Sequence, residues 1–160
     1  MPLHELLSTS KQYILVTAPG WDSVKAELKL FSRETIYGNW QQDGETIDVV
    51  VGKNGLAWGR GLHKIPVEAE NIKIEGDNKA PIGVFRIGCS FGTHKTSQNP
   101  NWPHIYIHEK MLGIDDPDSR YYNCIVDSSE IPDKDWKSAE TMNREDGLYE
   151  YGLVVEHNMN

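Results

Sequence analysis

Two cysteine side chains are the first groups to test for chemistry, because a thiolate is a strong nucleophile once a neighbouring base or cation lowers its pKa. Cys89 lies in the segment GCSFG, and His94 follows in the same polar stretch. His104 and His108 come later, and spacing alone brings no imidazole to the thiol. Free cysteine is among the most buried residue types. We therefore predict that Cys89 is a buried structural cysteine at the end of a strand and Cys124 another, with a Cys89-centred enzyme as the alternative.

Metal and cofactor motifs begin at several places, and each is incomplete. His108 opens a segment like the zinc-protease pattern H-E-x-x-H, but Leu112 stands where the second histidine is needed. On one strand, His104 and His108 would lie about 13 Å apart, too far to bind one metal ion together. The segment 59–64 lacks the third glycine of a dinucleotide fingerprint, and the segment 116–120 has an arginine where a calcium loop needs an oxygen ligand. The sequence predicts no metal site and no cofactor.

The elements that must position these side chains are mostly strands. Apolar and charged residues alternate in 24–31, which is the period-two pattern of a half-buried strand. The pair Asp43-Gly44 predicts a hairpin turn. One helix is expected around 133–142, where Trp136 and Met142 fall on one face. Short apolar runs between Gly, Pro, Asn and Asp predict further strands at 12–17, 46–52, 83–88, 104–108, 122–127 and 149–155.

Many short strands with turn-rich connections favour a sandwich or an open barrel. We therefore expect a single, mainly β domain over residues 1–160 with one or two short helices. Two long irregular segments, 52–83 and 91–103, interrupt the strands. Loops of this length in a compact domain usually serve a function or are disordered. Trp58 and Arg60 favour an ordered binding surface in the first of these segments.

The composition narrows the possible partners. A net charge of −8 repels phosphate backbones, and no basic run interleaved with aromatic residues occurs, so we expect no nucleic-acid binding. No apolar run approaches the roughly 20 residues that a membrane-spanning helix needs. The first residues, MPLHELLSTSKQ, lack the basic region and long apolar stretch of a secretory signal. We expect no membrane span and find no export signal in this sequence.

One segment is more specific than any of these, KIEGDNKAPIGVFRIG at 73–88. A polar turn runs into Ala80-Pro81, where proline favours extended backbone in its predecessor, and Gly83 is expected to open a strand. The segment resembles the (T/A)-P-x-G-x-F-x-I signature of the L,D-transpeptidase (YkuD-like) catalytic domain, a family that cross-links bacterial peptidoglycan. Resemblance to one branch of this family extends over nearly the whole chain and is weakest before Trp40. Its other blocks follow in the family's order at 49–63, 115–127 and 135–158.

The resemblance implies an L,D-transpeptidase-like β-sandwich or open barrel that carries a cysteine nucleophile. In this family the thiolate attacks the amide between the third and fourth residues of a peptidoglycan stem peptide, and an amine or water resolves the acyl-enzyme. The family's catalytic His and Cys motifs follow a V-(E/D)-H-N segment, which here is 155–158. Neither motif occurs in residues 1–160, and neither Cys89 nor Cys124 matches the nucleophile. We therefore expect no catalytic residue here, and an inactive domain that lacks its C-terminal catalytic strands.

The resemblance also implies a peptidoglycan stem peptide as the partner and the periplasm or cell envelope as the location. Three function classes stay open: an inactive, truncated transpeptidase-type domain, a non-catalytic peptidoglycan-binding module, and half of an enzyme that another chain completes. The third follows because missing strands would leave an unpaired sheet edge, which favours association, including self-association. The candidate substrate-binding residues are His157, Asn158, Trp58, Arg60, Tyr122 and Asn123.

Overall fold

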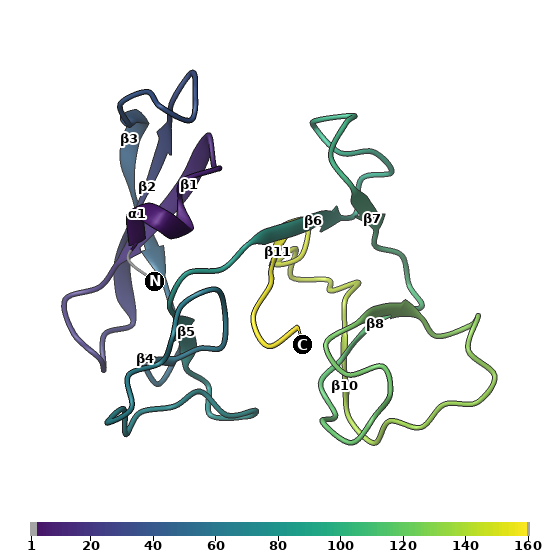
Figure 1. The fold of residues 1–160 in the computed structure, drawn as a ribbon. Helices are drawn as coiled ribbons and strands as arrows, with labels where there is room; N and C mark the ends of the chain where they lie inside the picture. The colour runs from purple at the N-terminus through teal and green to yellow at the C-terminus, as the bar shows by residue number, and fades with distance from the viewer. Residues whose placement is uncertain (1–2, 160) are drawn as a thin grey trace. The chain divides into compact units, whose positions relative to one another are not determined.

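A computed structural model describes residues 3–159 of the chain, which divides into two compact units. The first unit ends at Phe85, and the second begins at Arg86. Short strands make up most of the regular structure of each unit (Figure 1). The predicted mainly β class is therefore confirmed. The finer expectations, a single domain over residues 1–160 and an L,D-transpeptidase-like sandwich or open barrel, stay predictions.

The first unit contains a three-stranded antiparallel sheet in the order β1-β2-β3. Its strands are β1 (Gln12–Thr17), β2 (Lys25–Ser32) and β3 (Gln41–Val50), and they follow the short helix α1 (Leu3–Leu6). The predicted strands at 12–17 and 24–31 are thus confirmed. Along β2, buried Ala26 alternates with exposed neighbours, as the period-two pattern requires.

The predicted hairpin turn at Asp43-Gly44 is wrong. Strand β2 ends at Ser32 and β3 begins at Gln41, so residues 33–40 make the connection. Asp43-Gly44 lies inside β3, where the pairing with β2 shifts register and Gly44 has a φ of 73°. Additional residues on one strand form a β-bulge, and glycine takes the positive φ at little cost. The same dipeptide suits a bulge and a tight turn, which explains the error.

The long segment 52–83 is ordered by backbone hydrogen bonds. Strands β4 (Leu56–Trp58) and β5 (Ala80–Ile82) form a parallel pair. The Trp58 N–H donates to the Asn71 carbonyl at 2.7 Å, and the Lys73 N–H donates to the Trp58 carbonyl at 2.9 Å, which adds a third segment. Buried backbone groups need such partners. These bonds therefore give the segment a defined conformation in the first unit.

Gly83 ends a strand instead of opening one, so that part of the expectation for 83–88 is wrong. It follows β5 with a φ of 144°, and regular pairing resumes only at Ile87. The Val84 N–H donates to His63 Nδ1 at 3.1 Å, so a side chain takes the donor that a sheet would use. The imidazole also packs where a Cβ at Gly83 would stand. Glycine is therefore required here by both conformation and space.

The second unit contains two three-stranded sheets. Six of its strands are β6 (Ile87–Gly92), β7 (His104–Tyr106), β8 (Met111–Ile114), β9 (Ile125–Asp127), β10 (Ala139–Thr141) and β11 (Tyr151–Val155). The strand orders are β11-β6-β7 and β10-β8-β9, and only the β6-β7 pair is parallel. Ile107, Met111 and Met142 form the core of this unit. Strands predicted at 104–108, 122–127 and 149–155 are present in shortened form.

The predicted helix around 133–142 is wrong. Its backbone is irregular up to β10, which pairs with β8. Asp135 accepts a hydrogen bond from Ser119 Oγ at 2.6 Å, and the Lys137 N–H donates to the Asp116 carboxylate at 2.7 Å. Side-chain bonds of this kind offer the backbone an alternative to a helix. The helical spacing of apolar residues was therefore misleading.

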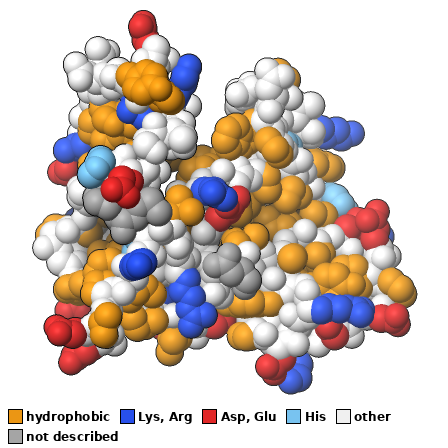
Figure 2. All heavy atoms as spheres, in the orientation of Figure 1, with side chains coloured by type: hydrophobic (Ala, Val, Ile, Leu, Met, Phe, Trp, Pro, Cys, Tyr) orange, Lys and Arg blue, Asp and Glu red, His pale blue; other side chains and the backbone are white. Residues whose placement is uncertain are grey.

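None of the helices in residues 3–159 could cross a membrane, since α1 has only four residues. Figure 2 shows hydrophobic side chains at the surface beside charged ones. Exposed large hydrophobic residues include Val50 on β3 and Leu153 on β11. Both strands are edge strands among the described residues, so part of this apolar surface belongs to sheet edges.

Candidate functional site

Strand β11 carries the predicted residues of the V-(E/D)-H-N segment to the end of a sheet. Tyr151, Leu153 and Val155 point to one exposed side, while the residues between them are half-buried. After the strand, the Glu156 N–H donates to the Arg86 carbonyl at 3.0 Å, and the His157 N–H donates to the Val155 carbonyl at 2.7 Å. These bonds hold the backbone of His157 at the strand end, and its side chain is half-buried.

Two of the predicted residues are in direct contact. Asn123 Nδ2 donates a hydrogen bond to the Asn158 carbonyl at 2.9 Å, although the two residues are 35 positions apart. Both have positive φ angles, 61° and 57°, and asparagine tolerates this conformation better than most residues. The Asn123 N–H also donates to the Ile114 carbonyl at 3.0 Å. The contact therefore anchors the end of β11 on the loop that carries Tyr122 and Asn123.

This loop is fixed by carboxylates that the sequence analysis treated as an incomplete calcium motif. Asp116 is buried and accepts hydrogen bonds from the Lys137 and Asp118 N–H groups, and these bonds lower the pKa of its carboxyl. Ser119 Oγ donates to Asp135 and accepts from the Tyr121 N–H at 3.1 Å. The network positions the backbone directly before Tyr122. An Asp and a Ser three residues apart in a turn could have indicated it, because these side chains bond to nearby backbone.

The other two predicted residues, Trp58 and Arg60, lie in the first unit. Trp58 ends β4 and packs edge-on against Trp21, with ring centroids 5.9 Å apart. It also lies against His63 at 5.8 Å. Trp58 lines a cavity of about 390 Å³, whereas Arg60 is exposed and is not among the lining residues. Two of the six predicted residues thus lie in the first unit and four in the second. Among the four, Asn123 and Asn158 are in direct contact.

A thiol and an imidazole do not form a catalytic pair among residues 3–159. Cys89 is half-buried inside β6, not at its end, and makes no hydrogen bond to a histidine. His104 bonds instead to Ser90 Oγ at 2.9 Å and to the His94 carbonyl at 2.8 Å. Cys124 is exposed in the turn before β9, where Sγ donates to the Tyr122 carbonyl at 3.7 Å. The prediction that Cys124 is buried is wrong, because that turn places it at the surface.

His108, which was considered above as a possible metal ligand, is paired with a carboxylate. This histidine precedes β8, and its Nε2 atom lies 3.2 Å from Oδ2 of Asp127 at the end of β9. The Ser129 hydroxyl and N–H donate to Asp127, and these bonds lower the pKa of its carboxyl. Within residues 3–159, His, Cys, Asp and Glu side chains form no group of three that could hold a metal ion.

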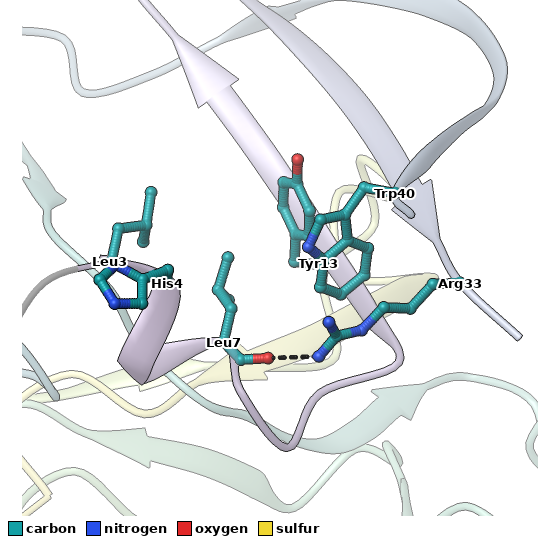
Figure 3. A pocket seen from close by; sticks show the side chains of 6 residues that line it. All are labelled: Leu3, His4, Leu7, Tyr13, Arg33 and Trp40. Atoms are coloured by element: carbon teal, nitrogen blue, oxygen red, sulfur yellow. Dashed lines mark hydrogen bonds between the residues drawn. The ribbon is translucent and has the colours of Figure 1, made fainter. Parts of the chain in front are cut away.

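Arg33 lines a second cavity of the first unit, of about 420 Å³, together with side chains such as Tyr13 and Trp40 (Figure 3). Arg33 donates to the Ser10 carbonyl at 2.8 Å and to the Leu7 carbonyl at 2.7 Å. Its guanidinium lies 4.2 Å from the centre of the Trp40 ring, and Tyr13 packs edge-on against the same ring. These carbonyls follow α1, so Arg33 attaches the first residues to the sheet. These hydrogen bonds give Arg33 a structural role.

Comparisons of the chain with models of protein families, with curated proteins and with solved structures found no match.

Proposed function

We propose that this chain is an L,D-transpeptidase-like domain that holds peptidoglycan stem peptides in the cell envelope and does not itself carry out acyl transfer. The observation that carries the proposal is the hydrogen bond from Asn123 to Asn158. It joins two of the sequence blocks that resemble the family, 115–127 and 135–158, beside His157. Local agreement between separate blocks supports reading them as parts of one peptide-binding surface.

The chemistry of this surface suits the backbone of a peptide. An imidazole, a phenol and amides supply both donors and acceptors, which a peptide backbone needs. Acyl transfer also needs a thiolate with a histidine beside it, and residues 3–159 hold no such pair.

Binding of a synthetic stem tetrapeptide, followed by amide chemical shifts, tests the proposal. We expect saturable shifts at 121–124 and 156–158, and about tenfold weaker binding by His157→Ala, since a lost charged or polar contact costs about 1.5 kcal/mol. His4→Ala is the matched control, because His4 is exposed on α1 in the other unit. Equal binding by His157→Ala and the wild type would contradict the proposed site. Tetrapeptide turnover by the pure chain, abolished by alkylation of Cys89, would contradict the inactive reading.

A second candidate, half of an enzyme completed by another chain, is favoured by the edge position of β11. No other strand among residues 3–159 pairs with its outer edge, and Tyr151, Leu153 and Val155 are exposed. An unpaired apolar edge strand is a template for strand addition. Light scattering tests it: concentration-dependent association that Leu153→Lys abolishes is expected, and a monomer at every concentration would oppose it.

A further inference from the structure

The cavity beside Trp58 has walls of a different chemical character from the predicted peptide site. Trp21 and Trp58 form its aromatic side, and Pro66, Glu68, Ala69, Glu70 and Asn71 form the remainder. Its volume of about 390 Å³ falls within the range of roughly 300–1,000 Å³ that is usual for small-molecule sites. The Trp21 side chain is 43% exposed, so the aromatic wall is open to a ligand.

Backbone hydrogen bonds fix these walls before any ligand arrives. The Leu56 N–H donates to the Trp21 carbonyl at 2.7 Å, which ties the first tryptophan to β4. Gly55 lies so close to the same carbonyl that a Cβ would collide with it. On the other side, the Trp58 N–H donates to the Asn71 carbonyl at 2.7 Å. A preformed wall loses little conformational entropy on binding.

The charged side chains that line this cavity are acidic, Glu68 and Glu70. The Asn71 side chain already makes two hydrogen bonds, since Nδ2 donates to the Leu56 carbonyl at 2.7 Å and Oδ1 accepts from Lys79 Nζ at 2.6 Å. Glu68 and Glu70 are exposed and make no hydrogen bond or ion pair with another described residue. A ligand in the cavity therefore meets two indole rings and two carboxylates that pair with no other described residue.

We propose that this cavity binds an organic ammonium ion. A cation over an indole face is attracted by the ring quadrupole, and the carboxylates add attraction of the same sign. An anion would be repelled by Glu68 and Glu70, and a neutral apolar group would cover carboxylates without pairing them. The inference goes beyond the proposed function. It concerns a cation and a cavity of the first unit, whereas the proposed stem-peptide site lies in the second unit.

Choline is the probe, and dimethylbutanol, its uncharged carbon isostere, is the control ligand. The indole N–H resonances of the five tryptophans report binding residue by residue. We expect choline to shift the Trp21 and Trp58 signals saturably in the millimolar range, with the other three tryptophans unaffected. The double substitution Glu68→Gln and Glu70→Gln should weaken binding about fivefold or more. Glu34→Gln with Glu45→Gln is the matched control, since both glutamates are exposed in the same unit.

Equal shifts with dimethylbutanol and choline would overturn the proposal, and so would full affinity in the Glu68/Glu70 double variant. Choline shifts confined to Trp40, Trp102 or Trp136 would also overturn it, because they would place the ion elsewhere. The stem-peptide titration separates this inference from the proposed function. If the cavity proposal holds, His157→Ala leaves choline binding unchanged.

Discussion

The Asp77 carboxylate organises the polar turn of the signature segment 73–88, and its removal should unfold that turn. Asp77 accepts hydrogen bonds from Lys73 Nζ at 2.6 Å, from the Ile74 N–H at 3.0 Å and from the Lys79 N–H at 2.9 Å. The side chain is only 13% exposed. Burial alone would raise the pKa of Asp77, but the hydrogen bond from Lys73 and those from the two backbone N–H groups outweigh burial and lower it to about 2.

The pKa shift sets the size and the sign of the expected effect. A carboxyl whose pKa falls from 3.8 to about 2 on folding stabilises the native state by about 2 kcal/mol when ionised. Because the folded pKa is the lower one, this stabilisation is complete above the unfolded pKa. It declines as the pH falls from about 5 through the folded pKa of about 2, below which the carboxyl is protonated in both states. Asp77→Asn should therefore cost about 2 kcal/mol at pH 7 and much less near pH 2.

Hydrogen exchange of the Ile74 and Lys79 amides measures this stability within the first unit. We expect the protection factors of both amides to fall by about 30-fold in Asp77→Asn at neutral pH. Asp48→Asn is the matched control, because Asp48 is exposed on β3 in the same unit. The reasoning is refuted if Asp77→Asn and Asp48→Asn show the same protection at pH 7. A difference that persists undiminished at pH 2 would refute the assignment to the ionised carboxylate.

Three further substitutions, the first with a glycine control, test the packing and the polar contacts. Gly83→Ala should cost more than about 2 kcal/mol by urea unfolding, because its Cβ would meet the His63 ring. Gly76→Ala is the control and should cost about 1 kcal/mol, because Gly76 has a positive φ but open space around it. Ser119→Ala should cost about 1 kcal/mol, since it removes the hydrogen bond of buried Ser119 to Asp135 and the acceptor of the Tyr121 N–H, and loss of amide protection at Tyr121 would report it. Met142→Ala should cost about 2–5 kcal/mol by thermal unfolding of the second unit, because it opens the core around Ile107.

The longer strands were predictable because their side-chain pattern repeats. The run 12–17 and the alternating run 24–31 are both strands of the β1-β2-β3 sheet. Strands β4, β5 and β10 have three residues each, which is too few for a period-two pattern to appear. The segment 133–142 shows the opposite failure, in which a helical pattern exists but carboxylate bonds from Asp116 and Asp135 hold the backbone in another conformation.

The candidate sites depend on contacts between residues far apart in sequence, and this limits what a sequence pattern can predict. Trp58 was predicted as a binding residue, but its partner Trp21 is supplied by the turn before β2. The contact of Asn123 with Asn158 likewise needs both residues in positive-φ conformations. Resemblance placed Asn123 and Asn158 on the same list of candidates, but only the fold provides the hydrogen bond between them.

The carboxylates of this chain fall into two groups, which the net charge alone does not distinguish. Asp77, Asp116 and Asp135 accept hydrogen bonds from side-chain or backbone donors, and these bonds lower the pKa of each carboxyl. These carboxylates hold irregular segments in place, so their charge is already matched by donors inside the fold. Glu68 and Glu70 have no such donors among the described residues and lie beside two indole rings. Carboxylates of this second kind are the ones that a cationic ligand would meet, because no residue from 3 to 159 pairs with them.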